Sequence, residues 1–178
     1  MTKGVKQFGL GLCVCAAVFA ANRWAQVPLS GSIAIHWGQA ICFFSLLVFG
    51  PRVAMPAAFA AGLGLMLTGG HQFLPVLAVI ELGLIWVLFR RSVPLVAGAL
   101  LFWLLIGLPL YWLLARGGAA ISSHDLHVQL LITALNGTFN AGLASGFYLL
   151  LVALRIPFFT NDSKAYPLFR QVFGLIVN

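Results

Sequence analysis

Long apolar runs, separated by single or paired basic residues, constrain this chain more than any other feature of its sequence. Residues 93–114 form one such run and include no charged side chain. A helix needs about 20 apolar residues to cross the hydrocarbon core of a bilayer. In hydrocarbon every backbone N–H and C=O group needs an internal partner, which only helices and closed barrels supply. Barrel strands alternate apolar and polar residues, whereas these runs are continuous, so the sequence predicts transmembrane helices.

The composition excludes a soluble globule. Only 7% of the 178 residues are charged and 62% are hydrophobic, whereas a soluble domain carries roughly 25% charged residues. The formal net charge is +7, but the basic residues lie between apolar runs and form no stripe with interleaved aromatic residues. That pattern argues against a nucleic-acid partner. We therefore expect a multi-pass protein of a bacterial inner (plasma) membrane.

The boundaries of the apolar runs predict an all-α polytopic transmembrane bundle of about six spans within residues 1–155. The predicted spans are 8–21, 32–49, 53–68, 73–89, 93–114 and 128–154. Gly and Pro punctuate helices, so Gly50-Pro51-Arg52 predicts a tight turn between the second and third spans. Residues 156–178 predict a linker and the start of a further apolar segment, which would lead to an output region of a longer protein.

The first span has an alternative interpretation as a cleavable signal peptide. Lys3 and Lys6 precede a short apolar run, and Val18-Phe19-Ala20 resembles a small-residue cleavage site. We favour a retained span, because helix-forming residues continue as far as Gln26. Removal of this segment would leave five spans and the same cytoplasmic C-terminus.

The basic residues predict the orientation of the bundle. With the N-terminus inside, eight of the 10 Lys and Arg residues fall in cytoplasmic segments, and Arg23 and Arg116 fall outside. The eight are Lys3, Lys6, Arg52, Arg90, Arg91, Arg155, Lys164 and Arg170. Short cytoplasmic loops carry an excess of Lys and Arg, so this bias predicts that both termini are cytoplasmic.

The compositions of the third and fifth spans predict opposite exposure to lipid. Residues 53–68 are rich in Ala and Gly, which let helix backbones approach closely in lipid. We expect this span to be central and the least exposed to lipid. Residues 93–114 are rich in Leu, Phe and Trp, so we expect them to be largely lipid-facing, with a kink at Pro109.

Glu81 is the most informative polar side chain, because it falls near the middle of the fourth span. A carboxylate at the bilayer centre costs about 2.5–3.5 kcal/mol on insertion scales. Such a residue is kept for a ligand, an ion path or an interhelical hydrogen bond. We expect Glu81 to face the bundle interior, within hydrogen-bonding reach of polar side chains on the second or sixth span.

Polar side chains in the second and sixth spans complete a candidate ligand-binding site. Asn136 and Asn140 are four residues apart and share one helix face, and each carboxamide offers a donor and an acceptor. His36 is expected one turn inside the outer edge of the second span, followed by Trp37 and Gln39. Helix packing and interhelical hydrogen bonding are the alternative roles for these side chains.

No sequence pattern predicts an enzyme, a metal centre or a cofactor. Ser/His/Asp, HExxH and P-loop motifs are absent. Cys13, Cys15 and Cys42 lie in apolar runs without ligand spacing and are predicted to be small buried packing residues. His124-Asp125-x-His127 has a superficial likeness to a metal cluster, but short polar loops often produce such strings.

A short motif in the sixth span carries a resemblance to known proteins. Asn136-Gly137-x-x-Asn140-Ala141, followed by Leu143-Ala144, resembles the last helix of the N-terminal membrane sensor regions of bacterial histidine kinases and diguanylate cyclases. The Arg155-Ile156-Pro157 exit into another apolar run is similar to theirs. The compact small-residue spans, with Gly50-Pro51-Arg52 and Glu81, are also similar to the six-helix substrate-binding components of vitamin transporters.

The first resemblance implies a membrane-embedded sensory domain of a signal-transduction protein. Such a domain would recognise a small-molecule ligand or its lipid surroundings and pass a signal through its C-terminal linker to a cytoplasmic kinase or cyclase. A substrate-binding subunit of a vitamin-like transporter is the alternative, and a structural membrane subunit without a ligand is a third. The oligomeric state stays open between a monomer and a homodimer.

Overall fold

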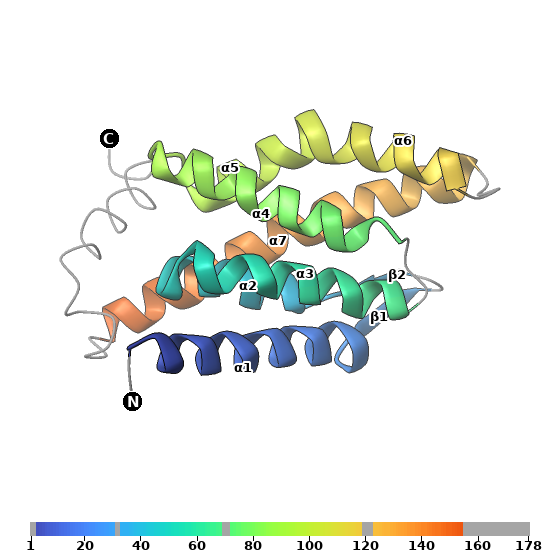
Figure 1. Ribbon diagram of the computed structural model, residues 1–178. Helices are drawn as coiled ribbons and strands as arrows, with labels where there is room; N and C mark the ends of the chain where they lie inside the picture. The colour runs from blue at the N-terminus through green and yellow to red at the C-terminus, as the bar shows by residue number, and fades with distance from the viewer. Residues whose placement is uncertain (1–2, 31–32, 69–71, 119–122, 155–178) are drawn as a thin grey trace.

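The computed structural model describes residues 3–30, 33–68, 72–118 and 123–154, and these are mostly helical (Figure 1). In chain order the elements are α1 (Lys3–Trp24), β1 (Val27–Ser30), β2 (Ile33–Ile35), α2 (Gly38–Phe49), α3 (Pro51–Leu67), α4 (Leu74–Arg90), α5 (Leu95–Phe102), the π-helix η1 (Trp103–Gly107), α6 (Leu108–Gly118) and α7 (Ser123–Ala153). The helices lie alongside one another in an elongated bundle (Figure 1). The predicted all-α fold class is confirmed. The predicted linker at 156–178 lies outside the described residues.

The turn between α2 and α3 forms where the sequence predicts it. Gly50 has φ 79°, a left-handed conformation that Gly adopts without a steric penalty. Pro51 then occupies the first position of α3, where its missing N–H group has no helical partner to lose. The third and fourth predicted spans correspond closely to α3 and α4.

The start of the second predicted span is wrong. Val27–Ser30 pairs antiparallel with Ile33–Ile35, and helix α2 begins only at Gly38. Short apolar runs are consistent with either a strand or a helix, and β-branched residues such as Val27, Ile33 and Ile35 favour strands. His36 therefore precedes the helix instead of lying one turn inside it.

The distortion predicted at Pro109 occupies the turn before it. Pro has no backbone N–H group and its ring crowds the preceding turn of a helix. The structure relieves this by a π-helical turn at Trp103–Gly107, which joins α5 to α6 as one continuous helical segment. Because a π-turn holds more residues than an α-turn, it shifts which side chains face inward.

Small residues bring α3 close to its neighbours, as predicted. A Cβ atom at Gly62 would overlap the backbone of Pro75, and one at Gly64 would lie 3.0 Å from the carbonyl oxygen of Phe19. Helix α3 accordingly packs against α1, α2 and α4. The prediction that this span is the least exposed is nevertheless wrong. No residue of α2 is exposed, because α1, α3 and α7 all pack against it, whereas α3 exposes Phe59 and Leu67.

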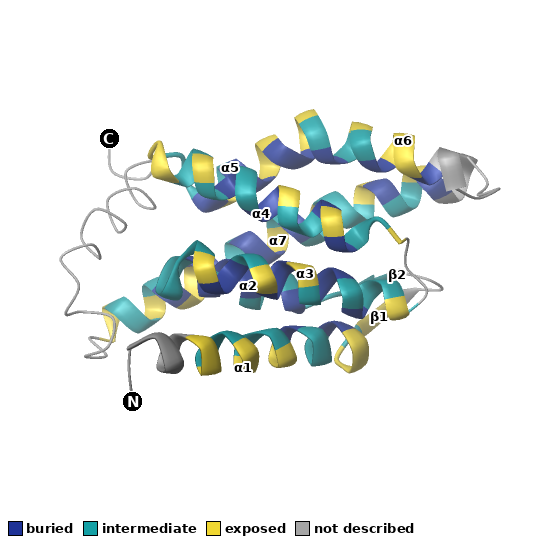
Figure 2. Cartoon of the chain, viewed as in Figure 1, coloured by how far each residue is buried: buried dark blue, intermediate teal, exposed yellow. Residues whose placement is uncertain are grey.

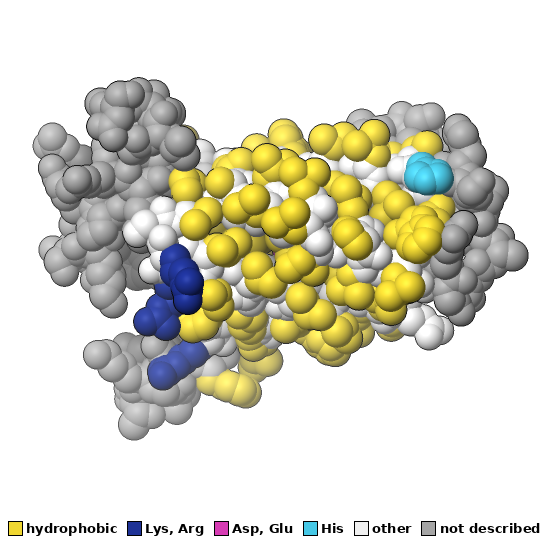
Figure 3. Space-filling model, turned by 90° about the horizontal axis from the view of Figure 1, so that it is seen from above, with side chains coloured by type: hydrophobic (Ala, Val, Ile, Leu, Met, Phe, Trp, Pro, Cys, Tyr) yellow, Lys and Arg dark blue, Asp and Glu magenta, His cyan; other side chains and the backbone are white. Residues whose placement is uncertain are grey.

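The face of the bundle seen in Figure 3 is apolar along most of its length, and Figure 2 shows exposed residues spread along the helices. The segment α5–η1–α6 buries one face and exposes another that includes Leu100, Leu104 and Leu105, in partial agreement with the predicted lipid-facing span. Within the described part of the chain, Leu95–Ala115 is the one helix of 21 residues that is long and apolar enough to cross a membrane. Three shorter apolar helical stretches have 10–17 residues: Phe8–Trp24, Gly38–Phe49 and Pro51–Leu67. Six membrane crossings stay a prediction.

Candidate functional site

Glu81 lies in the interior of the bundle, as predicted. Its side chain is 1% exposed, and both of its oxygen atoms accept hydrogen bonds from neutral donors. The indole Nε1 of Trp103 donates to Oε1 over 2.6 Å, and the carboxamide Nε2 of Gln39 donates to Oε2. The carboxyl therefore ties α4 to α2 and to η1. Gln39 is the expected partner from the second span, whereas Trp103 comes from the fifth span, which was predicted to face lipid.

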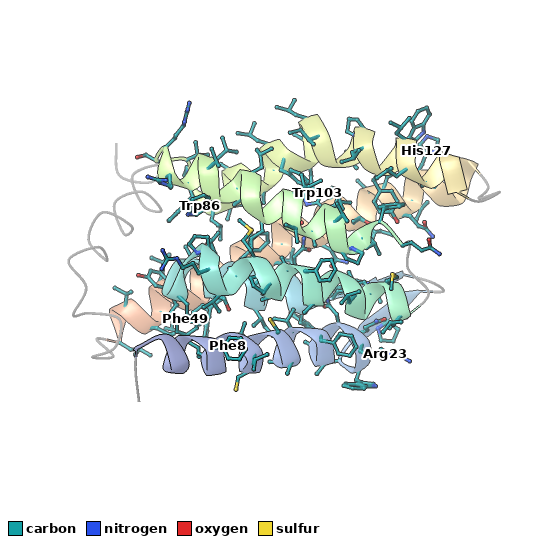
Figure 4. The ribbon with its side chains drawn as sticks, in the orientation of Figure 1. Phe8, Arg23, Phe49, Trp86, Trp103 and His127 are labelled. Carbon is teal, nitrogen blue, oxygen red and sulfur yellow. The ribbon has the colours of Figure 1, made fainter. Side chains whose placement is uncertain are left out.

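Trp103 reaches Glu81 because a glycine on α7 leaves room for its ring. A Cβ atom at Gly137 would overlap the indole of Trp103. The neighbouring ring of Phe102 lies edge-on to the indole at 5.3 Å between centroids, an arrangement that aromatic pairs favour. Trp103, labelled in Figure 4, is 2% exposed and lies inside the bundle. The π-turn, the glycine on α7 and the Glu81 carboxyl together fix this side chain.

The two asparagines of α7 bind the backbone that precedes α2. Asn136 donates to the carbonyl oxygen of Ala34 over 2.9 Å, and Asn140 donates to that of His36 over 2.8 Å. Both contacts join parts of the chain that lie more than a hundred residues apart. The prediction that these asparagines share one helix face is thus confirmed. These hydrogen bonds reach the hairpin and its exit, not Glu81.

Asn22 completes the anchoring of this segment, a role that was not predicted from the sequence. Its Oδ1 accepts from the backbone N–H of Gly38 over 2.8 Å, and its Nδ2 donates to the carbonyl oxygen of Ala61 over 3.0 Å. A Cβ atom at Gly38 would overlap this carboxamide. Asn22 is 1% exposed. The available signal was an asparagine in an apolar helix, the same signal that selected Asn136 and Asn140.

Four of these contacts converge on residues 34–39, the stretch that enters α2 from the hairpin. Side chains from α1, α4 and α7 hold its backbone or the side chain of Gln39. The ring of Trp37 also lies 6.4 Å from that of Phe139 on α7. We call residues 34–39 the entry segment. The six predicted site residues therefore lie on the entry segment or contact it, and their role in binding a ligand stays a prediction.

Two buried polar atoms beside the entry segment have no hydrogen-bond partner among the described residues. They are Nδ1 of His36 and Oδ1 of Asn140. An unsatisfied buried polar group costs about 1–3 kcal/mol, so such atoms are rare without a functional or solvent partner. A cavity of about 10 Å³, the room that one water needs, also lies beside Glu81, Gln39 and Cys42. The cavity has room for one water, and neither His36 nor Asn140 lines it.

The described side chains contain no group of three or more His, Cys, Asp or Glu residues arranged to hold a metal ion. His127 is exposed on α7, and the side chains of His124 and Asp125 lie outside the described part. Cys42 is buried and Cys15 is half-buried, but Cys13 is exposed. The predicted burial of all three cysteines is therefore wrong for Cys13, whose position in α1 faces away from α2 and α3.

Comparisons of the chain with protein-family models, with curated proteins and with solved structures find no match.

Proposed function

We propose that the chain is a bundle of six membrane-spanning helices in a bacterial inner membrane, with both termini cytoplasmic. Helices α3 and α4 have 17 residues each, or about 26 Å at 1.5 Å per residue, close to the bilayer core of about 30 Å. Exposed large apolar side chains occur on α1, α3, α4, α5, α6 and α7. Asn22, Glu81 and Asn140 each make hydrogen bonds inside the bundle, as a lipid environment favours.

This placement is tested by extraction of membranes with alkaline carbonate. An integral bundle stays in the membrane pellet and is released only by detergent. Release of the protein by carbonate alone contradicts membrane insertion.

We propose further that the bundle is a sensory input domain of a signal-transduction protein. The supporting observation is the entry segment, which joins the hairpin to α2 and is held by hydrogen bonds from α1, α4 and α7. A ligand that takes over some of these bonds favours a different packing of the helices, because a ligand shifts a conformational equilibrium by its differential affinity. The unpartnered atoms of His36 and Asn140 are the points where such a ligand engages.

Helix α7 provides a route for the signal. It carries Asn136, Gly137 and Asn140, which contact the entry segment and Trp103, and it has 31 residues. A shift at these residues moves the far end of the same helix, at Ala153. A C-terminal output region would follow this end of α7. This arrangement links the polar site to the C-terminal part of the chain without an intermediate element.

A substrate-binding subunit of a vitamin-like transporter is the second candidate, because the same polar side chains could hold a small substrate. The coding sequence downstream of Asn178 separates the two. An in-frame kinase or cyclase domain supports the sensor, whereas a stop codon there, beside genes for a transport motor, supports the transporter.

The complete protein provides the functional test. We expect Glu81→Gln and Asn140→Ala to change kinase or cyclase output in membranes, because both variants alter bonds to the entry segment. Leu105→Ala is the matched control, since Leu105 is 69% exposed on the outer face of the bundle. Unchanged output in both site variants, with expression equal to the control, contradicts the sensory proposal.

A further inference from the structure

We propose that Arg52, Arg90 and Arg91 bind the phosphate headgroup of an anionic phospholipid at the cytoplasmic end of the bundle. The inference rests on the proposed membrane insertion, and it concerns a surface far from the entry segment. It assigns a specific lipid partner to residues that otherwise serve only to orient the chain.

The three arginines lie at the same end of the bundle. Arg52 is in the first turn of α3, Arg90 ends α4, and Arg91 follows it. Helices α3 and α4 are consecutive, pack against each other and are joined by a short connection, so they are antiparallel. All three side chains are exposed. Figure 3 shows Lys and Arg side chains gathered at one end of an otherwise apolar surface.

The local geometry positions one of these guanidinium groups. The Cζ atom of Arg90 lies 5.3 Å from the ring centroid of Trp86, one turn earlier on α4. A guanidinium over an aromatic face is held by a cation–π interaction. It keeps its N–H groups available, and these bind two phosphate oxygens in parallel. Trp86 therefore holds the guanidinium of Arg90 beside the last turn of α4.

The charge balance of this end favours an anion. The chain has 3 acidic residues. Glu81 is buried in the middle of the bundle, and Asp125 belongs to the first turn of α7, at the opposite end. Asp162 lies outside the described residues. No described carboxylate is thus available to neutralise the three arginines, and α1 begins at the same end with Lys3 in its first turn (Figure 1).

The surface next to the arginines suits the acyl chains of the same molecule. Val87 on α4 is 47% exposed and Val96 on α5 is 37% exposed, and apolar side chains continue from there along the bundle (Figure 3). A phospholipid can place its phosphate on the guanidinium groups and its chains on this apolar face at once. Free phosphate would use only the first of these contacts, so the surface favours an anionic lipid.

The experiment compares lipid binding by variants of the whole chain. Protein purified in detergent is titrated with phosphatidylglycerol or phosphatidylcholine, and bound lipid is counted by native mass spectrometry. We expect phosphatidylglycerol to bind in preference to phosphatidylcholine. Each basic residue near an anionic surface contributes about fivefold. Arg52→Gln/Arg90→Gln/Arg91→Gln should therefore lose about a hundredfold in affinity for phosphatidylglycerol.

Arg23→Gln is the matched control, because Arg23 is an exposed arginine in the last turn of α1, at the other end of the bundle (Figure 4). It should bind phosphatidylglycerol like the unaltered protein. Equal binding by the triple variant overturns the proposal, and so does an equal loss in Arg23→Gln, which would indicate general charge attraction. Full displacement of the lipid by inorganic phosphate at matched concentration also overturns it in favour of a phosphate site. Carbonate extraction of the same preparations tests membrane insertion separately, so the two failures are distinguishable.

Discussion

Replacement of Glu81 tests whether the buried carboxyl organises the bundle. In Glu81→Leu the two donors that now face the carboxyl lose their acceptor. Trp103 is 2% exposed and its indole N–H donates to Glu81, whereas Gln39 is half-buried and can turn toward another group. The stranded indole N–H therefore accounts for most of the effect.

The expected magnitude follows from the number of bonds that are lost. A buried donor without a partner costs about 1–3 kcal/mol, and interhelical hydrogen bonds in membranes contribute about 0.6 kcal/mol on average and about 1.7 at most. Leu has nearly the volume of Glu, so no large cavity forms. We expect Glu81→Leu to lower the free energy of unfolding by about 2 kcal/mol.

Glu81→Gln should lose less than Glu81→Leu. The Gln side chain keeps one carbonyl oxygen for the indole N–H of Trp103, and its new amide can donate to the carboxamide oxygen of Gln39 once that group rotates. We expect a loss below about 1 kcal/mol. The assay is equilibrium unfolding in mixed micelles, followed by the helical circular dichroism signal.

A double-mutant cycle with Trp103→Phe isolates the bond itself. Phe keeps the aromatic ring and removes only the donor. We expect a coupling energy between positions 81 and 103 of at least about 0.6 kcal/mol. Buried polar groups can also be replaced by well-packed apolar ones without loss. If Glu81→Leu is as stable as the unaltered protein and the coupling is near zero, the carboxyl does not hold these helices together.

Four further predictions address the fold. With the three native cysteines removed, introduced cysteines at 119–125 should react with an impermeant reagent outside intact cells, and those at 90 and 164 should not; labelling at 164 contradicts cytoplasmic termini. Gly64→Leu should destabilise the bundle more than Leu105→Ala, because Gly64 abuts Phe19 and Leu105 is 69% exposed; the reverse ranking in unfolding assays refutes the packing. Gly137→Ala should cost about 1–3 kcal/mol through overlap with Trp103, whereas Gly142→Ala, which meets nothing within 4 Å, should be neutral or slightly stabilising in the same assay. Asn140→Ala frees the carbonyl of His36, so amide exchange in residues 27–39 should accelerate relative to α4; unchanged exchange shows that the bond does not hold the entry segment.

The predictable parts of this fold are those with a local sequence cause. Gly50 and Pro51 specify a turn through their own backbone preferences, and the small residues of α3 allow close approach to any neighbour. Glu81 was expected inside because lipid offers a carboxyl no partner, and its burial confirms this. Such inferences need only the residue and its solvent.

The missed features depend on contacts between distant segments. The run through Ile33 and Ile35 is apolar whether it forms a strand or a helix, so its periodicity could not distinguish them. Trp103 was assigned to the lipid face because its neighbours are bulky, and the π-turn that brings it inward beside Phe102 has no sequence signature apart from Pro109. The partners of Asn22 depend on how α1 packs against α2 and α3. This packing cannot be predicted from the amino-acid sequence alone.

The most direct test of the sensory account is the output activity of the complete protein in native membranes, compared between Glu81→Gln and Leu105→Ala. Glu81→Gln preserves most of the stability but changes the bonds to Gln39 and Trp103, so we predict altered kinase or cyclase output with an intact fold. Leu105→Ala removes an exposed apolar side chain and should leave the output unchanged. Equal output from both variants and from the unaltered protein contradicts the sensory account. A complete protein that has no kinase or cyclase activity also contradicts it.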